Sequence, residues 1–206
     1  MLPRTVIITV TAFKGGVGKT TSAVHLATYL SRQAPTVLVD GDLIRSATRW
    51  SRRGRLSFPV VGERQLGKAV RQHEHVVIDT QARPDPEDIE ELAAGCDLLV
   101  VPTTPDMMAL EGVLLTIGAL KKAGGGGRYK VLLTMVPPKP SREGEEARMM
   151  LEEDALPVFR SQVRRLVAFR KAALEGIPVY EVNDPRAAWG WEDYKEVGDE
   201  VVMVER

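Results

Sequence analysis

The stretch FKGGVGKTT, from Phe13 to Thr21, decides which fold this sequence predicts. It stands between an apolar run at 5–12, which has the composition of a buried strand, and a helical pattern at 19–32. Its glycines let the backbone curl tightly, so that successive amides point inward. The helix that follows adds the positive end of its dipole, and together these groups attract phosphate. The stretch therefore predicts a phosphate-binding loop.

The residue types of this loop indicate how it would hold a nucleotide. Lys19 stands where its ammonium can reach the β- and γ-phosphates, and the hydroxyl of Thr20 can ligate Mg²⁺. The usual pattern opens with a glycine, whereas this chain has Phe13 and then a second lysine, Lys14. The residues expected to bind the nucleotide are Lys14, Gly15, Gly16, Val17, Gly18, Lys19, Thr20 and Thr21. The alternative is a chance glycine turn in front of a helix.

Strand and helix patterns alternate along the rest of the chain. Runs that are apolar on both faces predict strands at 5–12, 36–40, 75–79, 97–102 and 129–136, with a weaker one at 57–62. Helical patterns lie at 19–32, 43–53, 63–73, 85–95, 106–123 and 142–154, and an amphipathic helix is expected at 191–206. We expect Trp189 and Trp191 to pack this last helix onto the sheet. The alternation predicts one α/β domain, 1–206, with a doubly wound, mostly parallel sheet covered by helices on both faces.

Three aspartates lie at or just after the ends of predicted strands. Asp40 and Asp42 close the segment TVLVDGD, and Asp79 closes HVVID. Ligands of such sheets bind beyond the carboxyl ends of the strands, where the phosphate loop also lies. We therefore expect Asp79 to hold Mg²⁺, while Asp40 and Asp42 share two tasks, supporting the metal and activating the attacking water. The alternative for Asp42 and Asp79 is that each only caps the next helix.

Composition excludes several classes of protein. The 28 basic and 28 acidic residues give no net charge, so attraction to a polyanion would need local clustering. The single cysteine, Cys96, rules out an intramolecular disulfide and a cysteine-rich metal site. No run of about 18 apolar residues predicts a membrane span, and the N-terminus does not read as a signal peptide.

Basic residues cluster in two places. The segment 159–171 contains five of them and no acidic residue, and basic side chains of this kind can contact nucleic-acid phosphates without sequence specificity. Its basic residues are Arg160, Arg164, Arg165, Arg170 and Lys171. A second run, at 45–55, holds Arg45, Arg49, Arg52, Arg53 and Arg55, and it could contact DNA or a partner protein. The alternative for both runs is a solvated helix face.

Four motifs together resemble a known family. KGGVGKTT with its leading lysine, VDGD, VVIDT and DLLVVPTTPDMMALEG occur in the order found in the deviant Walker A ATPases of the ParA/MinD superfamily. The resemblance runs from Val6 to about Val201 and is greatest to the short ParA proteins. These proteins partition plasmids or position cargo over the nucleoid.

The resemblance implies an ATPase that requires Mg²⁺ and forms a homodimer when ATP binds. Lys14 matches the signature lysine that crosses the dimer interface to the partner's nucleotide, and Asp42 matches the acid that activates water, with Asp40 and Asp79 around Mg²⁺. Met135 and Pro185 would contact adenine. The dimer would bind nonspecific DNA through the segment 159–171, a ParB-like or cargo-adaptor protein would stimulate slow hydrolysis, and the protein would be cytoplasmic and nucleoid-associated, with no membrane partner.

The chain departs from the family pattern at two loops, and other functions remain as alternatives. Asp42-Leu43-Ile44 replaces the common Asp-Pro-Gln, and Asp79-Thr80-Gln81-Ala82 replaces Asp-Thr-Pro-Pro. A MinD-like ATPase that cycles on membranes would need a basic amphipathic C-terminal helix, whereas this tail is acidic. An electron-transfer protein of the nitrogenase-reductase type would need two cysteines per subunit. A ligase of the dethiobiotin synthetase type would need a substrate pocket.

Overall fold

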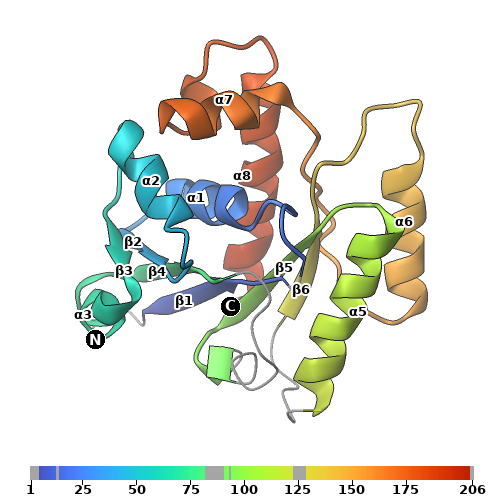
Figure 1. Ribbon diagram of the computed structural model, residues 1–206, viewed down its shortest axis with the longest axis horizontal. Coiled ribbons are helices and arrows are strands. Elements are labelled where there is room, and N and C mark those ends of the chain that lie inside the picture. Colours follow the sequence, from blue (N-terminus) through green and yellow to red (C-terminus); the bar gives the residue numbers. More distant parts are fainter. Residues whose placement is uncertain (1–4, 13, 82–90, 93, 123–128, 205–206) are drawn as a thin grey trace.

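Six parallel strands form the centre of the molecule (Figure 1). The computed structural model describes residues 5–12, 14–81, 91–92, 94–122 and 129–204. The strand order is β3-β2-β4-β1-β5-β6, and every pairing is parallel. The strands are β1 (Val6–Val10), β2 (Thr36–Asp40), β3 (Val60–Gly62), β4 (His75–Asp79), β5 (Leu98–Thr103) and β6 (Tyr129–Leu133). The predicted α/β fold with a parallel sheet is confirmed.

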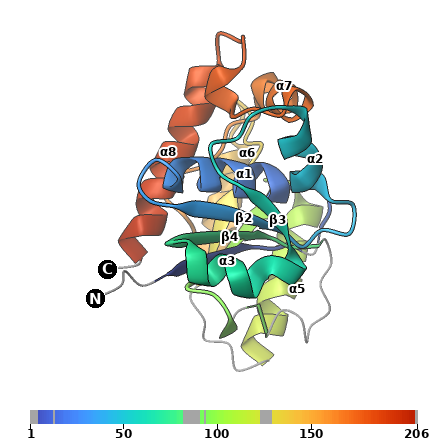
Figure 2. The ribbon, with the colours of Figure 1, turned by 90° about the vertical axis from the view of Figure 1, so that its left-hand side faces the viewer.

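Helices cover both faces of this sheet, as predicted. Figure 2 shows α1 above strands β2 and β4, and α3 below them. The helices are α1 (Lys19–Leu30), α2 (Ser46–Arg53), α3 (Leu66–Gln72), α5 (Met107–Lys122), α6 (Glu143–Glu153), α7 (Val167–Glu175) and α8 (Ala187–Val204). Short 3₁₀ turns lie at η1 (Glu63–Gln65) and η2 (Val179–Glu181). Most of the helix predicted at 85–95 lies outside the described residues.

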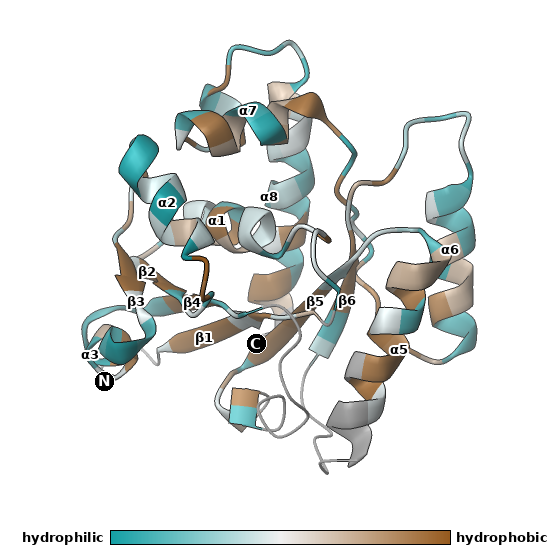
Figure 3. Ribbon diagram, viewed as in Figure 1, coloured by the Kyte–Doolittle hydropathy of each residue, from teal (hydrophilic) through white to brown (hydrophobic). Residues whose placement is uncertain are grey.

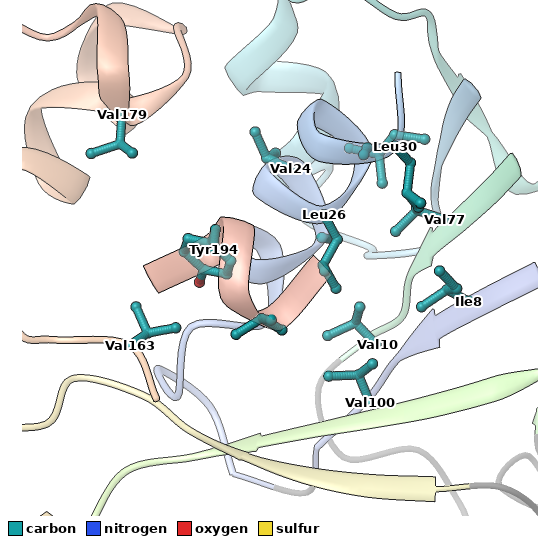
Figure 4. Packing of buried hydrophobic residues seen from close by; sticks show 14 of the residues in the cluster. Ile8, Val10, Val24, Leu26, Leu30, Val77, Val100, Val163, Val179 and Tyr194 are labelled. Atoms are coloured by element: carbon teal, nitrogen blue, oxygen red, sulfur yellow. The ribbon is translucent and has the colours of Figure 1, made fainter. Parts of the chain in front are cut away.

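Side chains alternate between two cores, one on each face of the sheet. Val77 and Val100 point to the core that α1, α7 and α8 complete (Figure 4). Val76 packs with α3, and Val101 packs with α5 and α6 on the other face. Figure 3 colours the strands hydrophobic for this reason. Because both faces are buried, the strand sequences are apolar throughout instead of alternating.

Helix α1 is held firmly against α8. The Tyr194 ring of α8 stacks on the His25 ring of α1, with centroids 4.8 Å apart, and the Tyr194 hydroxyl lies 3.0 Å from Ser22 Oγ. The backbone N–H of Val179 in η2 donates to His25 Nε2 over 3.0 Å. The glycine loop leads directly into α1, so this buried packing fixes the start of the helix.

Two expectations about the C-terminal part are wrong. Trp189 does not pack onto the sheet, because it is 53% exposed on the outer side of α8 and the Arg164 guanidinium lies 5.7 Å from its ring centroid. Trp191, by contrast, is buried in a core cluster that contains strand residues, and its ring also meets Tyr180 of η2 at 5.0 Å. Helix α8 also begins at Ala187, before the predicted start, and α7 is a separate helix that the patterns did not predict.

Candidate nucleotide-binding site

The glycine loop lies at the carboxyl end of β1 and runs straight into α1. Gly16 and Gly18 have φ angles of 80° and 86°, which L side chains rarely adopt. An added Cβ at Gly15 or Gly16 would meet nothing within 4 Å, so the backbone faces open space. Gly18 is the N-cap residue of α1, and no side chain caps that end. The free amides of the loop and of the first helical turn are therefore available to an anion.

Thr134 ties this loop to the end of β6. Its hydroxyl donates to the Val17 carbonyl over 2.8 Å and lies 3.1 Å from the Thr103 carbonyl. Thr134 lay inside the strand predicted at 129–136, where no role was expected for it. In the structure β6 ends at Leu133, so Thr134 follows the strand, as the glycine loop follows β1.

Asp79 is the most perturbed acid of the site. Its carboxylate is fully buried at the end of β4, and Oδ2 accepts a hydrogen bond of 2.7 Å from the Thr20 hydroxyl. Burial raises the pKa of Asp79 to about 7, although the Thr20 hydrogen bond and the Lys19 ammonium act in the opposite direction. Burial also lowers the pKa of Lys19, while the charges of Asp79 and Asp42 raise it. Lys19 and Asp79 are thus a closely coupled pair at the loop.

The residues around Asp79 fit a magnesium ion. Asp79 Oδ1 is buried without a hydrogen-bond partner among the described residues, an arrangement that is costly unless another group binds it. The Thr20 hydroxyl is adjacent, and both groups offer hard oxygen ligands. Within the described part of the chain, no cluster of three or more His, Cys, Asp or Glu forms a metal cage. Mg²⁺ seldom needs one, because it keeps waters and shares nucleotide phosphates.

Asp40 lies beside Asp79 but is engaged differently. The two residues are register partners across β2 and β4, and both are buried. Asp40 Oδ1 accepts from the Asp42 amide at 3.2 Å, and Oδ2 accepts from the Thr48 amide and hydroxyl at 2.8 and 2.5 Å. The Asp40 carboxylate therefore anchors the first turn of α2 to the sheet.

Asp42 is held by the loop that follows it. Its carboxylate accepts from the Ile44 amide at 3.2 Å and from the Ser46 hydroxyl at 2.8 Å. These contacts hold the turn before α2, whereas the amide of Thr48 in the first turn of the helix is bound by Asp40 and not by Asp42. Asp42 is nevertheless only half-buried, and its charge acts on Lys19. Its position therefore permits two roles, holding the loop before α2 and activating water at a bound nucleotide.

The second lysine of the loop occupies a different environment from the first. Lys14 Nζ donates to Asp106 Oδ1 over 2.8 Å, and Asp106 also accepts from the Thr104 hydroxyl. Both partners of the ion pair are partly exposed, with side-chain exposures of 35% for Lys14 and 51% for Asp106. The Lys14 hydrogen bond is the main reason that the pKa of Asp106 is lowered. Lys14 thus pairs with Asp106, whereas the charge of Lys19 interacts with Asp79 and Asp42.

A cavity of about 520 Å³ opens beside the loop. Gly18, Thr21 and Met135 line one side of it, and the segment 163–170 with Tyr194 lines the other. Met135 has a positive φ of 51° and is 38% exposed. Of the two residues expected to contact adenine, Met135 borders this cavity beside the loop, whereas Pro185 lies exposed outside its lining.

The basic residues of 159–171 separate into two groups. Arg164 forms a bidentate ion pair with the buried Asp193 at 2.6–3.0 Å, and Lys171 pairs with Asp184 at 2.8 Å. Arg160, Arg165 and Arg170 are exposed, and within the described residues none of them pairs with a carboxylate. From the sequence, all five residues were expected to bind DNA. Of these five, only Arg160, Arg165 and Arg170 have guanidinium groups without a carboxylate partner in the described structure.

The fold and the loop define a P-loop nucleotide-binding protein. The family described as "CobQ/CobB/MinD/ParA nucleotide binding domain" matches residues 8–179, and the chain belongs to this family. The chain is 33% identical over 202 residues to Maintenance of carboxysome distribution protein A of Gloeobacter kilaueensis, covering 95% of this chain and 93% of that protein.

Solved structures show the same fold at lower identity. A putative plasmid partition protein of Borrelia burgdorferi bound to AMPPNP superposes with a TM-score of 0.73 at 17% identity, covering 98% of this chain and 100% of that one. The septum site-determining protein MinD of Pyrococcus horikoshii, complexed with Mg-ADP, gives a TM-score of 0.71 at 20% identity, covering 98% and 99%. In the described part of this chain, no helix has the length and apolarity to span a membrane.

Proposed function

We propose that this chain, as one domain, is an ATPase that dimerises on ATP, binds nonspecific DNA as the dimer, and positions a cargo over the nucleoid. The observation that carries the proposal is the pair of lysines on one phosphate loop. The charge of Lys19 interacts with the buried Asp79, whereas Lys14 is partly exposed and pairs with Asp106. A single nucleotide needs only Lys19. Lys14 is therefore available for a phosphate of the nucleotide on another subunit.

Nucleotide binding uses the amides of Gly15 to Thr21 and the ammonium of Lys19. Mg²⁺, held by the Thr20 hydroxyl and Asp79, would neutralise part of the phosphate charge. The Asp40 carboxylate supports this centre from behind, because it fixes the start of α2 and the loop that carries Asp42.

The adenosine part of ATP would occupy the cavity beside Gly18. Its volume of about 520 Å³ lies within the usual range for small-molecule sites. Met135 offers an apolar contact for the base, and Thr21 and Tyr194 border the same space. Pro185 could contact adenine only if its loop moved toward this cavity.

Hydrolysis would depend on Asp42. To orient a water at the γ-phosphate, its carboxylate has to give up the Ile44 amide or the Ser46 hydroxyl. Each of these is a hydrogen bond to a charged carboxylate, worth about 1.5–3 kcal/mol net, so the rearrangement adds a barrier to hydrolysis. This supports slow hydrolysis that a partner protein accelerates by reordering the loop.

DNA would be bound by the three exposed arginines, Arg160, Arg165 and Arg170. Arg165 and Arg170 also border the cavity assigned to adenosine. A nucleotide in the cavity would therefore order the segment that meets DNA, which links DNA binding to the nucleotide state. Contacts from guanidinium groups to phosphates give affinity without sequence specificity.

The cargo is proposed from the relatives. The protein of Gloeobacter kilaueensis is named for carboxysome distribution, and the similarity covers almost the whole of both chains. By analogy, the cargo of this protein would be a carboxysome or a similar large cytoplasmic body. An adaptor protein would link the cargo to the ATPase and stimulate hydrolysis. No observation favours the membrane-cycling alternative, since α8 carries acidic Glu192, Asp193, Glu196, Asp199 and Glu200.

The proposal is tested by DNA binding in a gel-shift assay at low salt, without nucleotide and with ADP, ATP or a slowly hydrolysed ATP analogue. The wild type should shift DNA only with ATP or the analogue. Arg165→Ala/Arg170→Ala should lose the shift, and Arg71→Ala, an exposed arginine on α3, should keep it. DNA binding that is equal in all nucleotide states would refute the switch, and no binding in any state would refute the nucleoid role.

A further inference from the structure

Helix α2 and the residues beside it form a basic surface. Residues 43–62 include five arginines and no acidic residue. The arginines, which are all exposed, are Arg45, Arg49, Arg52, Arg53 and Arg55. Among the described residues none of them forms an ion pair. Figure 3 shows α2 largely in hydrophilic colours. A stripe of uncompensated positive charge therefore lies at this edge of the molecule.

This basic surface also contains a hollow that polar and apolar side chains line in similar measure. A cavity of about 390 Å³ lies between α2 and β3, with Arg45, Arg49 and Arg52 on its rim. Val60 and Val61 lie within it, and Leu43 and Ile44 border it with exposures of 84% and 62%. Phosphate recognition needs the arginines but not the exposed aliphatic side chains. The combination fits an apolar side chain that is surrounded by carboxylates.

Helix α6 presents that combination. Residues 143–154 include six acidic residues and one basic residue, Arg148. Met149 is 57% exposed, and the acids at helical spacings of three and four residues from it, Glu145, Glu146, Glu152 and Glu153, share its face. Arg142 and Arg148 pair with Glu145 and Glu152 at 3.5 and 3.9 Å, leaving Glu146 and Glu153 without a cation within the described residues.

The two surfaces lie at opposite ends of the sheet. Helix α2 packs beside β3 and β2, whereas α6 packs in the core beyond β5 and β6 (Figure 1). They cannot meet within one chain. We propose that the basic α2 surface of one copy docks on the acidic α6 face of a second copy, with Met149 entering the hollow between the arginines. The contact is head-to-tail, so it continues from copy to copy and is separate from ATP-dependent dimerisation.

Charge favours a second copy as the occupant. The zero net charge of the chain conceals a positive end and a negative end that complement each other. Methionine is flexible and polarisable, which suits an irregular hollow. Because the charges are exposed, salt should weaken the contact strongly: the Debye length falls from about 10 Å at about 0.1 M salt to about 3 Å at about 1 M.

Sedimentation velocity of nucleotide-free protein over a concentration series tests the proposal. At about 0.1 M salt, the average mass should rise above the monomer value of 22.7 kDa with concentration, and at about 1 M it should return to that value. Arg49→Glu/Arg52→Glu and Glu146→Arg/Glu153→Arg should each abolish the rise. Lys68→Glu/Arg71→Glu, which reverses two exposed charges on α3, should leave it unchanged.

Mixing the two charge-reversal variants gives the decisive result. One variant has two acidic ends and the other has two basic ends, so neither associates with itself, but they complement each other and the mixture should recover the wild-type rise in mass. Circular dichroism establishes that each variant is folded. A wild type that stays monomeric at low salt, association that survives both reversals, or a mixture without recovery would overturn the proposal. Loss of DNA binding in the α2 variant without any self-association would instead assign the surface to DNA.

Discussion

Lys14 Nζ lies 2.8 Å from Asp106 Oδ1, so the start of α5 holds the surface lysine of the phosphate loop. In the proposed dimer this lysine has to leave Asp106 to reach the partner's nucleotide. The ion pair therefore opposes dimerisation in the single subunit. Because both side chains are partly exposed, the opposition is small, about 0.2–1 kcal/mol.

Replacing Asp106 should strengthen the ATP-dependent dimer. We expect Asp106→Asn to lower the dimer dissociation constant about 2- to 30-fold, because two such pairs open in each dimer and together cost about 0.4–2 kcal/mol. Sedimentation equilibrium with a slowly hydrolysed ATP analogue measures this constant. Glu111→Gln, on the same helix, is the control and should have no effect. An unchanged or weaker dimer in Asp106→Asn would show that the pair does not restrain Lys14.

The buried Asp79 carboxylate should lower the free energy of unfolding of the nucleotide-free protein. Burial raises its pKa from 3.8 to about 7, so the folded state binds a proton more tightly than the unfolded state. Stability from this group is therefore lost as pH rises from about 4 to 7. Asp79→Asn should raise the free energy of unfolding of the nucleotide-free protein by about 2–4 kcal/mol at pH 8 and little at pH 4.

The same Asp79→Asn variant should lose Mg²⁺-dependent nucleotide binding. Urea unfolding at the two pH values measures the stability gain, and titration with a fluorescent ATP analogue, with and without Mg²⁺, measures the binding loss. A variant that is less stable than the wild type at pH 8, or that binds Mg-nucleotide normally, would contradict the role given to this carboxylate.

Variants of Arg164 and of its neighbour Arg165 should have different effects, because Arg164 has a structural role and Arg165 is proposed to bind DNA. Arg164 pairs with Asp193, which is 5% exposed, so Arg164→Ala leaves a buried carboxylate without its partner. We expect a loss of about 1–3 kcal/mol, reduced by the solvent exposure of Arg164. Arg165→Ala should change stability by less than about 0.5 kcal/mol yet weaken DNA binding. Thermal unfolding and gel shift of both variants decide this, and equal stability losses would refute the distinction.

His25 should make the protein sensitive to acid. Burial lowers its pKa from 6.5 to about 4, and the neutral ring accepts from Val179 at Nε2 and contacts the Thr21 carbonyl through Nδ1. The unfolded state binds the proton first, so this contribution is complete above pH 6.5 and is lost as pH falls toward 4. The loss is about 3 kcal/mol.

Asp79 titrates in the opposite sense over part of this range, so the His25 effect is best measured in the Asp79→Asn background. There, stability should fall steadily between pH 6.5 and 4. His25→Gln in the same background should be less stable overall but nearly independent of pH in this interval. A similar slope in both proteins would assign the acid sensitivity to other groups.

Local sequence predicted the sheet and the phosphate loop because the information is local there. A buried strand needs a short apolar run, and the loop needs glycines between a strand and a helix. The contacts that define the remainder of the site join distant residues: Lys14 meets Asp106, which is 92 positions away, and Arg164 meets Asp193, which is 29 away. Charge counting cannot show such pairing, so the five basic residues of 159–171 looked equivalent. Only the folded chain separates Arg164 and Lys171 from the other three.

The role of Trp189 was missed for a related reason. A large aromatic residue near an amphipathic helix is usually buried, but here Arg164 covers the ring from outside while Asp193 holds the guanidinium. The role of Thr134 was not predicted, because a single threonine inside a predicted strand carries no pattern. Its hydroxyl acquires a role only where the glycine loop meets β6.

The central claim is that Lys14 makes dimerisation depend on ATP, and the most direct test is the molar mass in solution. Light scattering after size exclusion would compare the wild type and Lys14→Ala at about 1 M salt, where the proposed contact between α2 and α6 is screened. The wild type should be a monomer with ADP and have twice that mass with a slowly hydrolysed ATP analogue, while Lys14→Ala should bind the analogue and remain a monomer. A wild type with the same mass in both nucleotides, or a Lys14→Ala dimer, would contradict the account.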